Sequence, residues 1–574
     1  MKWLDKVQQA YAGSRRGNRE THGLDSDFAR RTYVPTGFED TLKAAILARR
    51  HRLIILCGNA GDGKTALLQR LAELLGYTPP RAKPGLVAFR PAAGGPQVEM
   101  NLDGSAAWDD HSSDAALDDF LAPFADGRAP DADVVRLLAI NDGRLLEWAE
   151  RRQTPLAATL RALLEGRPVD APHIAFIHLN RRALVGAFTS DGTLDVAFLD
   201  TLVDQLYGGD QADAIWSKCH SCIAQPHCEV FRAARLFGPA NLPGVVPDVE
   251  RRRLARRRLY AAFQAVHLRG RMHITVRDLR GALVYILFGT ASCKTYWDEK
   301  PYPPYWARAF AAATKHRQGR LLEELTALDP ALEAQARLDR VLLKAVRRGF
   351  ARDLADARRR AYFEWTDAEV TAAGGPDARL DVARGRHLDL LRRLPFLSEK
   401  EKRELTAHLC HGLSRVESLP PVAYARAGVA PLRVQSRTPT ETVFWVEVQV
   451  ADFHLEADLQ VVNPFAAADQ RSGLHQSAYL THRTSGDSSL RLRLNADLFH
   501  MLLELDRGYR LSAATVDETF AHLTLFTEQL IRAQAGELYA WHPSREDTVY
   551  RLALRTCDLG WGLHQQLTIA PTGA

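Results

Sequence analysis

A strand, a glycine-rich loop and a helix follow one another without interruption at residues 53–73, LIILCGNAGDGKTALLQRLAE. The run Leu53–Leu56 is apolar and partly β-branched, which is typical of a strand buried on both faces. Gly58, Gly61 and Gly63 let the backbone of the loop curl until successive N–H groups point at one anion. The helix that follows turns its positive N-terminal end toward the same anion. This succession predicts an α/β domain with a phosphate-binding loop.

The loop reads G-x-x-x-x-G-K-T from Gly58 to Thr65, the pattern of a nucleoside-triphosphate site. Lys64 supplies a point charge for the β- and γ-phosphates, and the Thr65 hydroxyl is suited to Mg²⁺. We therefore predict ATP and Mg²⁺ as cofactors. The residues expected to contact them are Gly58, Asn59, Ala60, Gly61, Asp62, Gly63, Lys64, Thr65 and Ala66.

A hydrolase also needs an acidic residue near Mg²⁺ and a polar residue that orients the attacking water. Two later apolar runs, Val134–Ile140 and Ile174–Leu179, read as buried strands that end in such residues. Ligands of open parallel sheets bind beyond the carboxyl ends of the strands. We therefore assign Asp142, after the first run, as the Walker B acid that binds Mg²⁺, and Asn180, after the second, as the polar sensor.

A second candidate for the acidic role is Asp103, which closes the alternating stretch VEMNLDGS. Asn141 stands where many Walker B motifs carry their first acid, so the motif here departs from the usual pattern. Each of these residues could also be a capping or turn residue at a strand end. The sequence favours Asp142 over Asp103.

Three of the seven cysteines lie within ten residues, as Cys219, Cys222 and Cys228 in a C-x₂-C-x₅-C pattern. A tight turn followed by a helix can direct three thiolates at one metal ion. We favour Cys293 as the fourth ligand and tetrahedral zinc as the metal. His220 and His227 are alternative ligands, and three unligated core thiols are the alternative to a metal site. The remaining cysteines stand singly in apolar contexts and are predicted to be packing residues: Cys57, Cys410 and Cys557.

The chain is long enough for several domains, with 574 residues, and its net charge of +6 permits a nucleic-acid partner without demanding one. It contains no apolar run of eighteen residues, so we predict no membrane span. The first residues, MKWLDKVQQAYAG, lack the apolar region of a signal peptide. We therefore expect a cytoplasmic location, where cysteines stay reduced and clustered cysteines point to a metal.

The patterns of the chain divide it into five predicted parts. The stretch after residue 300 is helical in period, whereas TETVFWVEVQV and later stretches alternate with period two. The parts are an N-terminal lead-in at 1–52, a P-loop ATPase core at 53–245, a helical lid at 246–300, a helical region at 301–430 and an α+β module at 431–574.

Two further stretches suggest contacts with ligands. The run ERRRLARRRLYAAF, residues 250–263, carries six arginines in two triplets on a helical pattern. It reads either as a solvated helix face or as a surface that contacts phosphate. In the lead-in, Tyr33 and Pro35 are candidates for the adenine pocket, as in AAA+-type proteins.

The stretch HITVRDLRGALVYILFG, residues 273–289, resembles the small helical lid of AAA+ ATPases. The sensor-2 arginine of that lid, in motifs such as V-R-D-L, matches Arg277. The resemblance implies that Arg277 touches the γ-phosphate and couples the nucleotide state to the lid angle. The cysteine spacing also resembles the iron–sulfur clasp of some DNA nucleases, which makes a [4Fe–4S] cluster the alternative to zinc.

Together, GNAGDGKT, LAINDGRL, LNRRALVG, the cysteine cluster and ITVRDLRGAL resemble the DptF-type ATPases of bacterial DNA phosphorothioation-dependent restriction. The resemblance covers about residues 20–300. It implies an α/β P-loop NTPase core, AAA+-like, with a helical lid, acting with partner restriction subunits in defence against foreign DNA. Contacts with DNA itself and with further copies of the chain stay open. The alternative function is a nucleotide-dependent signalling switch or scaffold with protein partners only.

Overall fold

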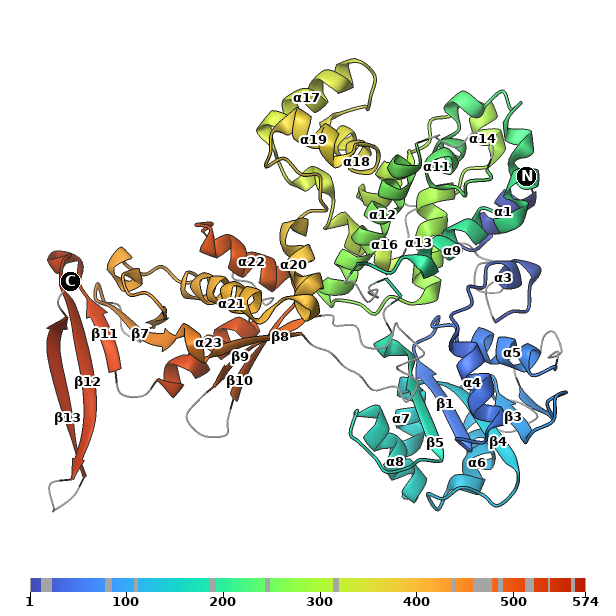
Figure 1. Cartoon of the computed structure of the whole chain (residues 1–574), viewed down its shortest axis with the longest axis horizontal. Helices are drawn as coiled ribbons and strands as arrows, with labels where there is room; N and C mark the ends of the chain where they lie inside the picture. The colour runs from blue at the N-terminus through green and yellow to red at the C-terminus, as the bar shows by residue number, and fades with distance from the viewer. Residues whose placement is uncertain are drawn as a thin grey trace. The chain divides into compact units, whose positions relative to one another are not determined.

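A computed structural model gives the fold of the chain (Figure 1). It describes residues 2–11, 23–77, 85–107, 112–182, 184–185, 193–242, 248–312, 319–435, 440–457, 477–483, 489–510, 521–534, 537–558 and 563–572. Contacts divide the chain into two compact units, which are treated separately below. Unit 1 comprises Met1–His267, Arg271–Ala383 and Leu459–Leu474, and unit 2 comprises Leu268–Gly270, Arg384–Asp458 and His475–Ala574.

Unit 1 contains a mixed five-stranded sheet in the order β2-β3-β4-β1-β5. Strands β3, β4, β1 and β5 are parallel, and β2 runs antiparallel to β3 at one edge. The register sets Gly58 of β1 opposite Asn141 of β4, so the glycine-rich loop and the end of β4 meet at the same edge. The strands are β1 (Leu53–Gly58), β2 (Leu86–Phe89), β3 (Gln97–Asn101), β4 (Val134–Asn141) and β5 (Ile174–His178).

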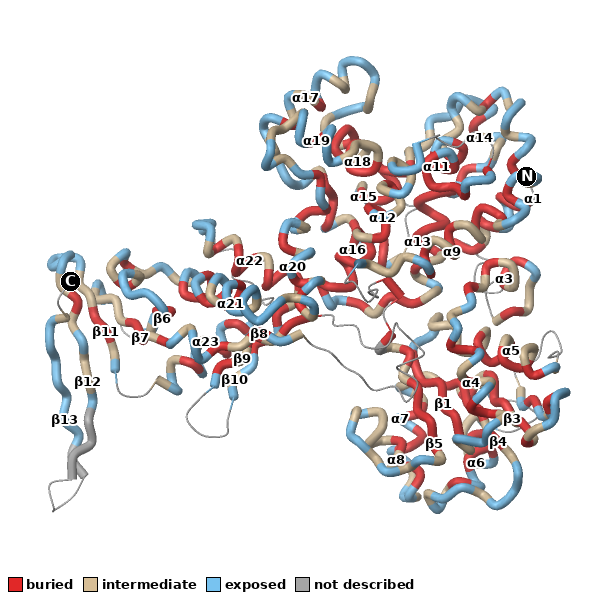
Figure 2. The backbone as a smooth tube through the Cα atoms, in the orientation of Figure 1, coloured by how far each residue is buried: buried red, intermediate tan, exposed pale blue. Residues whose placement is uncertain are grey.

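Helices cover both faces of this sheet, which confirms the predicted α/β core (Figure 1). Because side chains alternate along a strand, Ile54 and Leu56 pack with α4 (Phe38–Leu47) and α5 (Lys64–Leu74). The intervening residues of β1 pack on the other face with α6 (Ser113–Leu121), α7 (Asp142–Glu150) and α8 (Pro155–Leu164). Every residue of β1 is buried, as the tube in Figure 2 shows.

The rest of unit 1 is helical. Helix α13 (Val276–Phe288) packs against α1 (Lys2–Gln9), α9 (Ala197–Leu206) and α11 (Glu229–Phe237). Thus helices from the predicted core range 53–245 pack with helices from the predicted lid range. The other helices are α3 (Asp27–Arg31), α10 (Ala212–Trp216), α12 (Val249–Arg269), α14 (Cys293–Trp297), α15 (Tyr305–Phe310), α16 (Arg320–Thr326), α17 (Ala336–Arg347), α18 (Leu354–Glu364) and α19 (Asp367–Gly374).

Unit 2 combines helices with two antiparallel sheets, as the period-two stretches predict. The strand orders are β10-β9-β8 and β13-β12-β11-β7-β6. The elements are α20 (Leu388–Arg393), α21 (Glu399–Ser414), β6 (Val429–Val434), β7 (Val443–Gln449), β8 (Phe453–Ala457), β9 (Ala478–Arg483), β10 (Ser489–Leu494), α22 (Ala496–Asp506), α23 (Ala521–Ala533), β11 (Glu537–Trp541), β12 (Val549–Asp558) and β13 (Leu563–Thr572).

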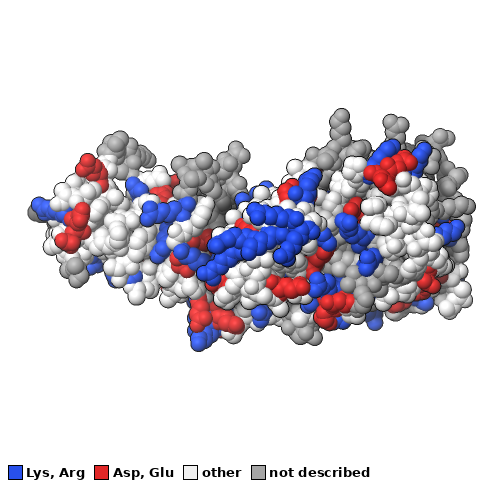
Figure 3. Space-filling model, turned by 90° about the horizontal axis from the view of Figure 1, so that it is seen from above, with Lys and Arg blue, Asp and Glu red and all other residues white. Residues whose placement is uncertain are grey.

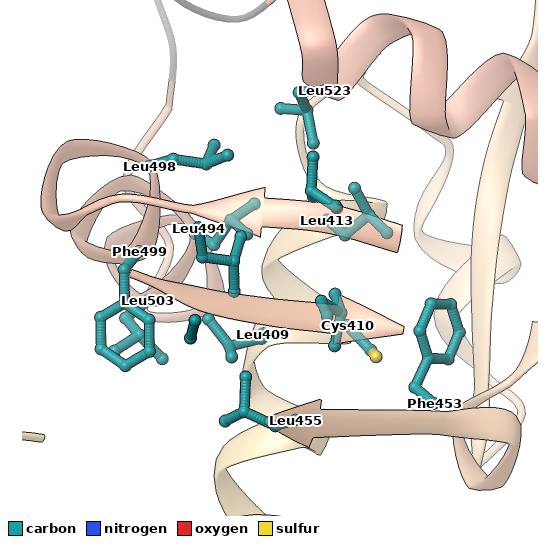
Figure 4. Close-up of a cluster of buried hydrophobic side chains, with 14 of the residues drawn as sticks. Leu409, Cys410, Leu413, Phe453, Leu455, Leu494, Leu498, Phe499, Leu503 and Leu523 are labelled. Carbon is teal, nitrogen blue, oxygen red and sulfur yellow. The ribbon is translucent and has the colours of Figure 1, made fainter. Parts of the chain in front are cut away.

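The core of unit 2 lies between its helices and its strands (Figure 4). Leu409 and Leu413 of α21 and Leu455 of β8 point into it. The close approach of α21 and α22 depends on Gly412, where an added Cβ would stand 1.9 Å from the Leu502 carbonyl oxygen. A side chain at this position would force the two helices apart.

None of the described helices is long and apolar enough to cross a membrane. This agrees with the absence of long apolar runs in the sequence.

Candidate functional site

The glycine-rich loop leads from β1 into α5 and forms one wall of a pocket in unit 1. Residues 60–67 line this pocket. Gly61 and Gly63 have φ values of 104° and 87°, a backbone conformation that side chains other than glycine's rarely adopt. Gly58 and Asn59 lie behind the lining, where the Asn59 amide donates to the Asp62 carboxylate at 2.6 Å. The pocket therefore meets the start of α5, where the first N–H groups lack partners within the helix.

Lys64 is held at the pocket by oxygen acceptors. Its Nζ donates to the carbonyl oxygens of Gly58 (2.9 Å) and Asn59 (2.8 Å), and to Oδ1 of Asn141 (2.8 Å). Burial lowers the pKa of the Lys64 ammonium, while nearby carboxylates, first that of Asp62, oppose the shift. An anion in the pocket would exchange neutral oxygen partners for a negative charge, which strengthens each contact of the ammonium.

The two acidic candidates have different surroundings. Asp103 follows β3 and lines the pocket together with Thr65. Asp142 is the first residue of α7, and its carboxylate accepts hydrogen bonds from the Cys57 thiol at 2.9 Å and from the Asn180 side chain. It is not among the residues that line the pocket. Since the Thr65 hydroxyl donates to the Leu102 carbonyl oxygen at 3.0 Å, this threonine faces the end of β3.

The two asparagines at the strand ends also differ. Asn141 lines the pocket and accepts from Lys64. Asn180 binds the backbone of the loop from behind, because its Oδ1 accepts from the Asn59 amide at 2.9 Å. The sequence prediction chose Asp142 and Asn180, whereas the pocket geometry favours Asp103 and Asn141. All four residues stand at or just after the carboxyl ends of parallel strands of one sheet, so the sequence could locate this edge of the sheet but not the side chains that face the pocket.

Helix α13 forms the opposite wall of the pocket. Thr275 caps its N-terminus in a reciprocal arrangement with Asp278. The backbone N–H of Arg277 donates to the Gly61 carbonyl oxygen at 3.2 Å. A Cβ added to Gly61 would lie 2.9 Å from the Arg277 Cβ, so only glycine admits this contact. The His273 ring adds a second link to the loop, with Nε2 2.9 Å from Asp62 Oδ1.

Two arginines of α13, Arg277 and Arg280, line the pocket. Arg277 is the predicted sensor and its side chain is exposed. Arg280, one turn further on, was missed by the sequence prediction, and its Nε is buried without a hydrogen-bond partner. Burial, followed by the nearby charge of Arg277, lowers the pKa of Arg280 to about 10, which leaves it charged at neutral pH. Among the described residues no carboxylate forms an ion pair with Arg280.

The N-terminal segment also lines the pocket, with both apolar and polar side chains, Glu39 among the latter. Tyr33 and Val34 line it, together with Leu184 and Phe198. The Tyr33 hydroxyl is tied to the Glu39 carboxylate, and burial raises the pKa of this phenol well above its usual value. Pro35, the other predicted adenine contact, is not among the lining residues.

The four predicted metal ligands are neighbours in unit 1. Cys228 caps the N-terminus of α11, and Cys293 begins α14. The indole of Trp297 in α14 donates to the Cys222 sulfur at 3.4 Å. Burial, and then the other three sulfurs, raises the pKa of Cys219 to about 12. The fold therefore brings Cys293 to the C-x₂-C-x₅-C turn, although 65 positions separate it from Cys228 in the sequence.

The donor set suits a soft metal centre, since four half-buried thiols lie together. His220 and His227 are exposed, so they fit the ligand role less well. The sulfurs do not form a group whose members all lie within 4.8 Å of one another. Sulfurs around zinc stand about 3.8 Å apart, given Zn–S bonds of about 2.3 Å, so the four sulfurs would have to move closer together to bind an ion. Cys57 and Cys410 are buried, and the side chain of Cys557 lies outside the described residues.

A group of potential metal ligands within 4.8 Å of one another occurs in unit 2, formed by His387, His500 and Glu504. His387 Nε2 lies 2.8 Å from Glu504 Oε1. Arg507 Nη1 lies 3.4 Å from the same nitrogen and 3.2 Å from Glu504. Because a guanidinium in this position repels a divalent cation, we assign the group to an internal ion-pair network.

The arginine triplets of α12 do not form a free basic face. Arg256 pairs with Asp200 and Asp204 of α9, at 3.0 and 2.5 Å. Arg258 is buried, and its Nη1 donates to backbone carbonyl oxygens at the end of α18. Arg251 and Arg252 likewise bind the Glu369 carboxylate and the Gly238 carbonyl. Neither sequence interpretation, a solvated face or a phosphate surface, describes these four arginines.

Comparison of the chain with protein-family models, with curated proteins and with solved structures finds no match in any of the three.

Proposed function

We propose that the chain is a P-loop ATPase of AAA+-like type, in which α13 acts as a lid that responds to the nucleotide. The observation that carries the proposal is the pocket itself, in which the glycine-rich loop faces two arginines of α13. Arg280 is half-buried, its Nε is buried without a hydrogen-bond partner, and no carboxylate among the described residues forms an ion pair with it. A phosphate group supplies the missing anion, and arginine binds phosphate through two parallel hydrogen bonds.

Different residues of the pocket would bind the phosphates, the Mg²⁺ ion and the purine ring of MgATP. Lys64 and the amides of residues 61–66 bind the β- and γ-phosphates, and Arg277 and Arg280 approach from α13. Thr65 and Asp103 line the same pocket and present the hydroxyl and carboxylate oxygens that Mg²⁺ prefers. The metal ion would offset charge that develops on the phosphates. We place the purine ring beside Tyr33, Val34 and Phe198, which line the same pocket.

The contact between Gly61 and Arg277 supports nucleotide control of the lid. A ligand shifts an equilibrium between two states only if it binds one of them more tightly. ATP and ADP differ in the γ-phosphate, so contacts from α13 to that group would favour a closed state with ATP. Nucleotide state would then control association with a partner subunit or with DNA. The proposal that the chain is a subunit of a DNA-targeting defence complex rests on the sequence resemblance alone. The alternative is a nucleotide-dependent switch that has protein partners only.

Replacement of the loop lysine tests the nucleotide site. Lys64→Ala should lower ATP affinity by about 10- to 100-fold, because a hydrogen bond to a charged group contributes about 1.5–3 kcal/mol. The measurement is a titration with a fluorescent ATP analogue, followed by phosphate release. The matched control is Lys400→Ala, which removes the same charge from an exposed position of α21. Equal ATP affinity of Lys64→Ala and wild type would refute the proposal.

The pair Asp103→Ala and Asp142→Ala tests the choice of acid. We expect Asp103→Ala to bind ATP and to lose turnover by about 100-fold, as for loss of a group that stabilises transition-state charge. Asp142→Ala should turn over faster than Asp103→Ala. If only Asp142→Ala loses turnover, the role returns to Asp142, as the sequence predicted.

A further inference from the structure

The face of unit 1 seen in Figure 3 carries a band of lysine and arginine side chains. Helix α17 lies on this face, at the top of Figure 1. Its basic residues are all exposed: Arg337, Arg340, Lys344, Arg347 and, at the C-cap, Arg348. Their spacings of three, four, three and one residues place them on one side of a helix with 3.6 residues per turn. We call these five residues the basic stripe.

The chain does not neutralise the basic stripe. Among the described residues, none of its five side chains forms an ion pair with a carboxylate. The one acid of α17, Asp339, is directed inward, where its carboxylate binds the buried Arg358 of α18. The three consecutive arginines of α18 are all paired with carboxylates, which shows how the neighbouring charges differ from the stripe. Five uncompensated cations on one face create a local positive potential.

The apolar side of α17 is already occupied. Leu338 and Leu342 are buried, and α17 packs against α18 and α19. A helix that lies in a membrane surface needs a broad apolar face to insert, and α17 exposes one large apolar side chain, that of Leu343. The basic stripe thus combines five cations with a single exposed leucine, which suits a hydrated polyanion better than a lipid surface.

We propose that the basic stripe of α17 contacts the sugar–phosphate backbone of a nucleic-acid duplex. The stripe spans eleven residue steps, or about 16 Å at 1.5 Å per residue. One strand of a duplex carries a phosphate every 3.4 Å along the axis, so about five phosphates fall within that length. Four of the five cations are arginines, whose planar group matches the phosphate oxygens. Binding should not depend on the base sequence, since the basic stripe contacts only the phosphates.

This proposal replaces the α12 triplets as the nucleic-acid surface, and it does not depend on the proposed ATP site. The test uses the full chain without nucleotide and a fluorescent DNA duplex of 20 base pairs. Fluorescence anisotropy gives the dissociation constant at 50 and at 200 mM KCl. For five phosphate contacts, the fourfold rise in salt should weaken binding by about 500-fold.

Two matched double variants separate the surfaces. Arg340→Ala/Arg347→Ala removes two charges from the stripe and should reduce that salt effect to about 40-fold, because three contacts remain. Arg253→Ala/Arg257→Ala removes two exposed arginines from α12, with the same change in net charge, and should keep the 500-fold effect. Circular dichroism confirms that both variants are folded.

Three results would overturn the proposal. The first is that the wild type does not bind the duplex. The second is that the salt effect is unchanged in the α17 variant. The third is that the α12 variant reduces the salt effect as much as the α17 variant does. Binding to phosphatidylserine vesicles or to an acidic peptide, without binding to a duplex, also overturns it. Binding of a duplex RNA that depends on the same arginines supports the proposal and identifies RNA as a ligand. The Lys64→Ala variant should still bind the duplex, because Lys64 is not part of the basic stripe. This result separates the test of the stripe from the test of the proposed ATP site.

Discussion

Helices α12 and α17 are both rich in arginine, yet the fold treats their charges in opposite ways. On α12, Arg256 faces two carboxylates of α9, and Arg258 faces the carbonyl end of α18. On α17, the only acid, Asp339, is directed inward, and the basic stripe faces outward. The charge content of a helix therefore does not reveal its partner. What matters is whether acceptors elsewhere in the chain reach the same cations.

The same distinction applies within the pocket of unit 1 and the cysteine cluster. Arg280 is as enclosed as the α12 arginines but lacks an anion among the described residues. The four cysteines lie together, and burial, followed by the other three sulfurs, raises the pKa of Cys219. Charged side chains that have partners elsewhere in the chain are expected to govern stability. Side chains without such partners are expected to govern ligand binding.

The largest effect is expected at the cysteine cluster. A bound metal must displace protons, since burial raises the pKa of Cys219 to about 12. At a free metal concentration a thousand times the dissociation constant, binding stabilises unit 1 by about 4 kcal/mol. Calorimetry with and without a chelator measures this, and Cys293→Ser should abolish the difference.

Elemental analysis of the anaerobically purified chain identifies the metal. Zinc is expected, and a visible charge-transfer band with iron would identify the [4Fe–4S] alternative. A chain that contains neither metal and is unaffected by chelation contradicts the site.

A slightly smaller effect is expected for a charge that the chain compensates. Arg258→Ala leaves the carbonyl oxygens of Tyr362 and Trp365 without their donor and should destabilise unit 1 by about 3 kcal/mol. Thermal unfolding measures the change. Arg257→Ala, an exposed neighbour, should stay within about 0.5 kcal/mol of wild type. Similar effects of the two substitutions would remove the distinction between paired and exposed arginines on α12.

The smallest effect is expected at the pocket arginine, with opposite signs for folding and binding. Arg280→Met removes a half-buried charge that has no ion-pair partner among the described residues, and it should raise the stability of the nucleotide-free chain by about 1 kcal/mol. It should weaken ATP binding by about 10-fold, and ADP binding by less. Nucleotide titration and thermal unfolding provide both numbers. A variant that is less stable and binds ATP normally would show that Arg280 is a structural residue.

Much of unit 1 could be predicted from local sequence, because the residues that make a segment form a buried strand or a tight loop lie within that segment. The strands at 53–56, 134–140 and 174–179 are buried apolar runs, and burial on both faces requires that composition. The glycine-rich loop needs positive φ values that only its glycines adopt readily, so its conformation is also encoded locally. The antiparallel sheets of unit 2 follow in the same way from alternation with period two.

The tertiary structure decided which polar groups meet. The sequence set Asp103, Asn141, Asp142 and Asn180 at strand ends, but strand order and helix capping determine that Asp103 and Asn141 face the pocket. Arg280 had no local signal, since one arginine on an apolar helix carries no information about the space it enters. The α12 triplets looked free because their acceptors on α9 and α18 are distant in sequence. Apolar burial is set by short-range periodicity, whereas the compensation of a charge depends on partners that only the folded chain brings within reach.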